Sequence, residues 1–111
     1  MRSDRERLQD ILEAIESIEK YTARGREVFS RDELIRVWVI HHIQIIGESA
    51  ANLSDELRNS SLDIPWLDIV YMRNILVHQY FGIDLNQVWN TVTVDLPVLK
   101  SKISHLLSNM Q

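Results

Sequence analysis

Apolar residues recur every three or four positions along most of this chain, which predicts helices that each bury one face. The first helix is expected from Ser3 to about Tyr21 or Thr22, because Ser3 and Glu6 have the spacing of a capping box. Gly25 follows as the expected stop, since glycine favours the backbone conformation found just after a helix. The apolar stripe of this helix consists of Leu8, Ile11, Leu12, Ile15 and Ile18.

A second helix is predicted to begin at Ser30, which would form another capping box with Glu33, and to continue to about Asn59. It is apolar on two sides, so we expect burial on two sides, with the second side meeting another subunit. The alternative is a central helix inside a single bundle. The core stripe comprises Ile35, Val39, Ile43, Ile46, Ala50, Leu53 and Leu57, and the second side Leu34, Val37, Trp38 and Ile45, mixed with His41, Gln44 and Glu48.

Two further helices complete the prediction. A third is expected to begin near Pro65 and to end near Tyr80, and a fourth to begin at Asp84 as its cap. Pro97 removes a backbone donor, which predicts a kink or break in this last helix. No strong segment alternates as a strand would. The fold class predicted is therefore all-α, an up-and-down four-helix bundle with the last helix kinked or split, in one domain over residues 1–111.

Composition narrows the class of protein. The chain has 111 residues, 45% of them hydrophobic and 25% charged, which is typical of a soluble globular domain. It contains no cysteine, which excludes disulfides and thiolate zinc sites. No stretch is long and apolar enough for a membrane span or a signal peptide, so a cytoplasmic protein is expected. The net charge of −4 argues against a nonspecific nucleic-acid coat but not against a local cationic pocket.

Metal chemistry is not expected. Adjacent helical histidines such as His41 and His42 point about 100° apart, so they cannot easily bind one ion together. No metal-binding helical motif and no glycine-rich phosphate loop is present. His41, Gln44 and Glu48 share one helical face and could border a polar pocket or cleft. The alternative is that these three residues are polar groups scattered in an interface between subunits.

The decapeptide from Tyr71 to Tyr80 concentrates polar chemistry within the predicted third helix. Asn74 and His78 stack four residues apart on a helix, and Arg73 and Tyr80 follow seven apart in an adjoining row. A cation, an amide, an imidazole and a phenol this close together suit a phosphate group. The alternative is ordinary structure, with a solvated arginine and histidine and a half-buried tyrosine.

The sequence resembles the HEPN superfamily, and more closely its HepT-like (DUF86) toxins of the MNT–HEPN toxin–antitoxin type. The central feature is an arginine followed after four residues by a histidine and, after one more, by a tyrosine. Combined with Asn74 directly after Arg73 and with the flanking segments, this pattern is fairly specific, and it extends over most of the chain. The matching segments are residues 44–48, 64–66, 73–84, 88–89 and 95–97.

The resemblance implies a helical-bundle homodimer in which two motifs face each other across a shared cleft. It implies a metal-independent ribonuclease toxin without cofactors, paired with a minimal nucleotidyltransferase antitoxin of the MntA type. Carried over by position, Arg73 and His78 would be catalytic, Asn74 would support them, and Tyr80 would be the residue that the antitoxin modifies with AMP. The alternatives are a non-catalytic module that binds a nucleotide or a partner, and a purely structural helical dimer.

Overall fold

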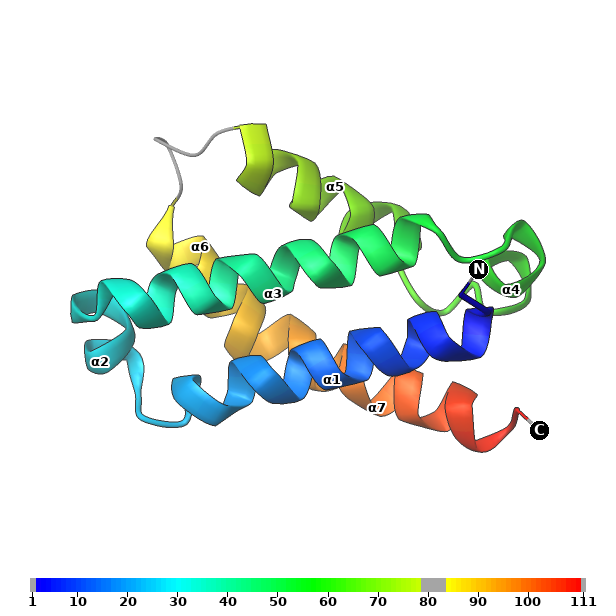
Figure 1. Ribbon diagram of the computed structural model, residues 1–111, viewed down its shortest axis with the longest axis horizontal. Helices are drawn as coiled ribbons and strands as arrows, with labels where there is room; N and C mark the ends of the chain where they lie inside the picture. The colour runs from blue at the N-terminus through cyan, green and yellow to red at the C-terminus, as the bar shows by residue number, and fades with distance from the viewer. Residues whose placement is uncertain (1, 79–83, 111) are drawn as a thin grey trace.

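The computed structural model describes residues 2–78 and 84–110, with side chains described for residues 2–72 and 84–110. Figure 1 shows that the long helices lie side by side, with α3 between α1 and α5. In chain order the elements are α1 (Asp4–Thr22), α2 (Arg26–Arg31), α3 (Glu33–Ala51), α4 (Asp55–Ser60), α5 (Trp66–His78), α6 (Leu85–Asn90), the π-helical turn η2 (Thr91–Asp95) and α7 (Leu96–Ser108).

Helix α1 begins and ends as predicted. The Ser3 hydroxyl accepts a hydrogen bond from the Glu6 backbone N–H at 3.1 Å, and the Glu6 carboxylate accepts one from the Ser3 backbone N–H at 3.1 Å. The capping box therefore satisfies two N–H groups that helix geometry leaves without partners. Beyond the helix, Gly25 has a φ of 102°, a conformation that strongly favours glycine, and α2 starts immediately after it.

The predicted start of the second long helix is wrong. Ser30 lies inside the short helix α2, and the chain leaves helical geometry at Asp32 before α3 begins. The Asp32 carboxylate accepts hydrogen bonds from the backbone N–H groups of Leu34 and Ile35 at 3.0 and 3.3 Å. Aspartate is as good an N-cap as serine, and here it displaces the cap predicted two residues earlier.

The predicted continuation of this helix to about Asn59 is also wrong, because α3 ends at Ala51 and α4 begins after Ser54. The Ser54 hydroxyl accepts a hydrogen bond from the Leu57 backbone N–H at 3.1 Å and so caps α4. Leu53, in the turn, is only 3% exposed and packs into the core. The core stripe thus remains buried although the helix is interrupted.

Helix α5 starts where the proline signal places it. Pro65 precedes the helix, and its carbonyl accepts a hydrogen bond from the Ile69 backbone N–H at 3.1 Å. The Trp66 indole, buried at the start of the helix, donates to the Ser61 carbonyl at 3.1 Å. The predicted end near Tyr80 lies outside the described residues, and the described part of the helix reaches His78.

The last helical segment is split as predicted, by a π-helical turn. Asp84 caps α6 by accepting a hydrogen bond from the Asn86 backbone N–H at 2.9 Å. Pro97 lacks the N–H that would bond to the Thr93 carbonyl in a regular α-helix, and η2 covers this part of the chain. Figure 1 shows that the chain changes direction between α6 and α7.

Together these elements form the predicted all-α bundle, and no strand occurs in residues 2–78 and 84–110. Helix α3 contacts both α1 and α5, and α7 packs along α1. The fully buried side chains come mainly from one face of α1 and one face of α3 and form a single cluster. Its largest fully buried side chains are Leu8, Ile11, Ile15, Ile18, Phe29, Val39, Ile43, Ile46, Leu96 and Ile103.

The second apolar side of α3 faces outward in the single chain. Leu34 and Val37 are 80% and 52% exposed, whereas Ile45 is half-buried against the core. Within the described part of the chain, no helix combines the length and the apolar character that crossing a membrane requires.

Candidate functional site

Three of the four predicted motif residues lie on the described backbone of α5. Arg73, Asn74 and His78 occupy its second half. Tyr80 lies outside the described residues. The roles of all four therefore stay predictions, and the backbone of α5 defines which side of the helix each of the first three positions occupies.

Two of these positions, those of Asn74 and His78, lie in one row of α5 together with Leu67 and Tyr71. Leu67 and Tyr71 are four residues apart, share one helical row, and are 80% and 64% exposed. Asn74 and His78 follow Tyr71 by three and seven residues, so their positions continue the same row. The asparagine and histidine positions therefore lie in the same helical row as the exposed Leu67 and Tyr71 side chains.

The arginine position belongs to another row of the same helix. Arg73 follows Trp66 by seven residues and Ile69 by four, and these two side chains are 5% and 7% exposed. On an α-helix the Arg73 and His78 positions are about 140° apart. A phosphate contacted by both residues of one chain would therefore lie at the edge of α5 rather than directly over one row.

Helix α3 supplies the surface beside the motif helix. Figure 1 shows α5 running antiparallel to α3, so the end of α5 points toward the N-terminal end of α3. His41 and Glu48 are exposed on α3, and Gln44 is half-buried. None of these three residues lines a cavity formed by the described residues alone, and their predicted role at a cleft stays a prediction.

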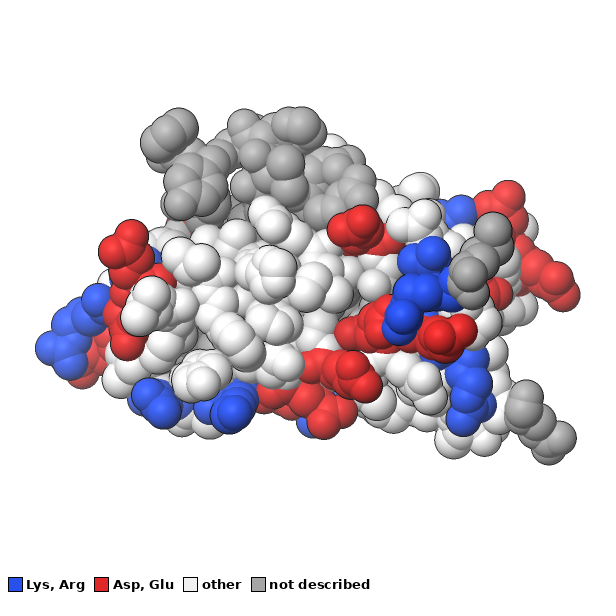
Figure 2. All heavy atoms as spheres, in the orientation of Figure 1, with Lys and Arg blue, Asp and Glu red and all other residues white. Residues whose placement is uncertain are grey.

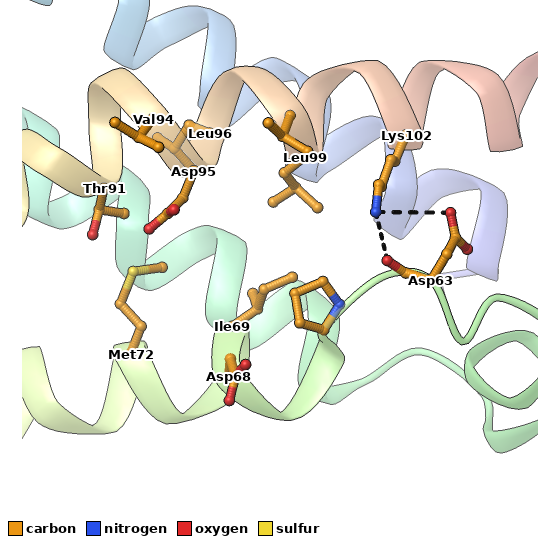
Figure 3. A pocket seen from close by; sticks show the side chains of 12 residues that line it. Asp63, Asp68, Ile69, Met72, Thr91, Val94, Asp95, Leu96, Leu99 and Lys102 are labelled. Carbon is orange, nitrogen blue, oxygen red and sulfur yellow. Dashed lines mark hydrogen bonds and ion pairs between the residues drawn. The ribbon is translucent and has the colours of Figure 1, made fainter.

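The structure also contains a cleft that sequence reasoning did not predict. It has a volume of about 470 Å³ and separates the first half of α5 from η2 and α7. Figure 3 shows Met72 and Asp68 on one wall, Asp95 and Leu99 on the other, and the Lys102 ammonium bonded to the Asp63 carbonyl at 2.6 Å at one end. Met72 lies on the opposite side of α5 from the Asn74 and His78 positions, so this cleft is separate from the outer row of α5.

The titration shifts resolved among the described residues arise from surface contacts away from α5. Hydrogen bonds from the Ser3 backbone N–H and hydroxyl lower the pKa of Glu6. A hydrogen bond to the Glu19 carboxylate raises the pKa of Lys100, and one to Asp10 raises that of Arg2. No group of three metal-binding side chains comes together in the described parts of the chain. His41 and His42 are close, with ring centroids 5.2 Å apart, but their planes are nearly perpendicular at 87°.

Comparisons with known proteins identify the family to which this chain is similar. The model of the family described as "Ribonuclease HepT-like" matches residues 11–106, which include the whole motif. A protein named probable ribonuclease HepT from Thermococcus cleftensis is 39% identical over 109 residues, covering 95% of this chain and 96% of that protein. None of the solved structures matches the chain significantly.

Two further relatives have names that begin "Putative RNase". The one from Methanocaldococcus jannaschii is 35% identical and covers 86% of this chain and 89% of its own length. The one from Caldanaerobacter subterraneus subsp. tengcongensis is 32% identical and covers 96% of each chain. With a family model and full-length relatives in agreement, this chain belongs to the ribonuclease HepT-like family.

Proposed function

We propose that this protein is an endoribonuclease that cleaves RNA without a metal ion. The observation that carries the proposal is the position of the family motif: Asn74 and His78 continue the exposed row of α5 that begins with Leu67 and Tyr71. A reactive histidine must reach a large polymer, and a position on the outer row of a rigid helix is suited to that. Membership in a family described as ribonuclease HepT-like supports RNA as the substrate.

The chemistry needs a base, an acid and a cation, which are roles suited to His78 and Arg73 when two copies of the motif act together. The RNA 2′-hydroxyl attacks the adjacent phosphorus and forms a cyclic phosphate, while the bond to the 5′-oxygen breaks. A base takes the 2′-hydroxyl proton, and an acid gives a proton to the departing 5′-oxygen. Histidine can do either because its ordinary pKa is about 6.5. The guanidinium of Arg73 would stabilise the charge on the pentacoordinate phosphorus through its forked donors.

We infer that the active site is composite and lies between two copies of the chain. One motif contains one histidine, whereas the reaction needs a base and an acid, so two facing motifs supply a matched pair. The exposed apolar side chains support such a seam: Val37 on α3, with Leu67 and Tyr71 on α5. Figure 2 shows a broad area over α3 without charged side chains, which is typical of surfaces that meet another subunit.

The proposal extends to a regulated toxin. We place the protein in the cytoplasm as the toxin of a HepT/MntA-type pair, whose antitoxin is a minimal nucleotidyltransferase. The Tyr80 phenol oxygen would attack the α-phosphorus of ATP, forming a new O–P bond and releasing pyrophosphate, while the phenolic proton passes to a base. The attached AMP would place negative charge where RNA phosphate binds, and Arg73 itself could contact it.

The test is cleavage of RNA by the purified protein in excess EDTA. We expect defined RNA transcripts to be cut into fragments with cyclic phosphate ends, and addition of Mg²⁺ should not be required. The second candidate function is a module that binds a nucleotide or partner at the same surface without cleaving it, which the acidic net charge of −4 favours. Binding of RNA or nucleotides without any cleavage would support that module and remove the enzyme.

A further inference from the structure

Four side-chain rings form a continuous row of contacts from the outer face of α3 to the end of α1. The ring centroids of Tyr21 and Trp38 are 5.3 Å apart with planes at 80°, an edge-to-face contact. The Trp38 and His42 centroids are 4.3 Å apart, and those of His42 and His41 are 5.2 Å apart. We name this set the aromatic row: Tyr21, Trp38, His42 and His41.

Hydrogen bonds hold the central rings in place. The Trp38 indole N–H donates to the Ser17 carbonyl at 2.8 Å, which ties the indole on α3 to the backbone of α1. His42 Nδ1 lies 2.7 Å from the Trp38 carbonyl oxygen, within hydrogen-bonding distance. Trp38 nevertheless remains 37% exposed. An exposed ring that is already fixed loses little conformational entropy when a flat partner stacks on it.

Two cations stand at the α1 end of the aromatic row. The Lys20 ammonium and the Arg24 guanidinium lie 5.6 and 5.2 Å from the centroid of the Tyr21 ring, within cation–π range. Neither takes part in an ion pair among the residues that the structure describes. Figure 2 shows basic side chains over the end of α1, at the edge of the uncharged area that covers α3. Positive charge is thus available locally on a chain whose net charge is negative.

We propose that the aromatic row and its two cations bind single-stranded RNA outside the catalytic cleft, which rests on the proposed function and deepens it. Unpaired bases stack on aromatic rings, and phosphates pair with Lys and Arg, in many proteins that bind single strands. Trp38 supplies the stacking surface, and Lys20 and Arg24 supply the phosphate contacts. A duplex hides its bases, so the surface selects unpaired RNA. The row lies mainly on α3, which also packs against the motif helix α5.

Binding is best measured with a 2′-O-methylated oligouridine, which lacks the free 2′-hydroxyl that the proposed cleavage requires. Stacking on Trp38 should quench intrinsic tryptophan emission, whereas the buried Trp66 and the half-buried Trp89, which packs against Phe29, should contribute an unchanged background. Trp38→Ala should raise the Kd roughly 5- to 150-fold, the range of one lost base–aromatic stack. Trp38→Phe keeps a ring, so it should retain most of the affinity but lose the quenching.

The cations give a second, independent readout. For single strands, log K falls linearly as the logarithm of the salt concentration rises, with a slope of about −0.7 for each phosphate contact. The double variant Lys20→Gln with Arg24→Gln should therefore reduce the magnitude of this slope by about 1.4. Arg31→Gln is the matched control, because Arg31 is exposed on α2 and pairs with Glu27 away from the aromatic row. Circular dichroism of each variant should match that of the parent.

Three results would overturn the inference. The first is that Trp38→Ala binds the oligouridine with the parent's affinity, while the parent shows no quenching of its tryptophan emission. The second is an unchanged salt slope in the double cation variant. The third is dissociation of the dimer by Trp38→Phe in sedimentation, which would assign the row to the seam between copies. If binding depends on Trp38 but no RNA is cleaved, the RNA-binding role of the aromatic row is supported and the proposed endoribonuclease activity is refuted. The two proposals can therefore be tested separately.

Discussion

The Asp4 carboxylate accepts two hydrogen bonds from Ser54, 50 residues further along the chain, one from the backbone N–H at 2.9 Å and one from the hydroxyl at 2.6 Å. The pair ties the start of α1 to the corner between α3 and α4. The same Ser54 hydroxyl accepts a hydrogen bond from the Leu57 backbone N–H. One serine therefore caps a helix and fixes a contact between two distant segments.

Loss of that hydroxyl should destabilise the bundle. We expect Ser54→Ala to lower the free energy of unfolding by about 1–2 kcal/mol, since it removes an N-cap and one bond to Asp4. Urea unfolding followed by circular dichroism measures the change. Ser104→Ala is the control, because Ser104 is exposed on α7 and its loss should cost less than about 0.5 kcal/mol. Equal effects of the two changes would contradict this account of the corner.

The capping box of α1 should make stability depend on pH in the acid range. The Ser3 backbone N–H and then the Ser3 hydroxyl lower the pKa of Glu6 below its ordinary value of 4.5. A carboxylate with a lowered folded-state pKa contributes fully above 4.5, and its contribution is lost as the pH falls through the lower folded value. Glu6→Gln should therefore lower Tm slightly at pH 7, and the difference from the parent should vanish in strong acid. Glu13→Gln, exposed in the middle of α1, is the control and should show no such trend.

The proposed homodimer predicts a sharp effect of charge on the outer face of α3. Sedimentation should give twice the 13.0 kDa of one chain, and Val37→Lys should weaken association at least about tenfold. Ile45 is a poorer probe because it is half-buried against the core, so a charge there would also disturb folding. Leu62→Lys, at a residue 80% exposed before α5, is the control. A parent protein that sediments as a monomer at micromolar concentration would refute the dimer.

The motif should be essential for cleavage and dispensable for folding. His78→Ala and Arg73→Ala should each lower the cleavage rate roughly 10²–10⁴-fold, or about 3–5 kcal/mol in the barrier, because each removes a proton-transfer or charge-stabilising group. Cleavage of a labelled RNA in EDTA measures the rate. His105→Ala removes an exposed histidine on α7 and should leave the rate unchanged. If both motif variants cut RNA as fast as the parent, the catalytic assignment is wrong.

Modification should distinguish Tyr80 from Tyr71, which lies nine residues earlier in the chain. After incubation with the nucleotidyltransferase partner and ATP, intact mass should show added AMP units on the parent and none on Tyr80→Phe. Tyr80→Phe should still cleave RNA, because only the acceptor oxygen is lost. Tyr71→Phe is the matched control, since Tyr71 is 64% exposed on α5 and offers a competing phenol. An adduct that persists on Tyr80→Phe and disappears from Tyr71→Phe would move the acceptor to Tyr71.

Part of the site could be predicted from sequence because it depends on local geometry. The spacing of Asn74 and His78 by four residues places them in one row of any α-helix, and the structure extends α5 through both positions. Which row faces solvent could not be predicted, because it depends on how Trp66 and Ile69 pack against the rest of the bundle. The cleft between α5 and α7 was missed for the same reason, since its walls are 19 or more residues apart in the chain.

The all-α class, the capping box at Ser3 and the buried stripes of α1 and α3 could be predicted from the chain, because each depends on residues within a turn or two of one another. The point at which the long predicted helix divides depends instead on contacts between distant segments. Asp32 competes with Ser30 for the cap, and Ser54 lies outside the helix and donates hydrogen bonds to Asp4 at the start of α1. A helical pattern specifies how a segment coils, whereas contacts with distant segments decide where continuing that helix costs more than ending it.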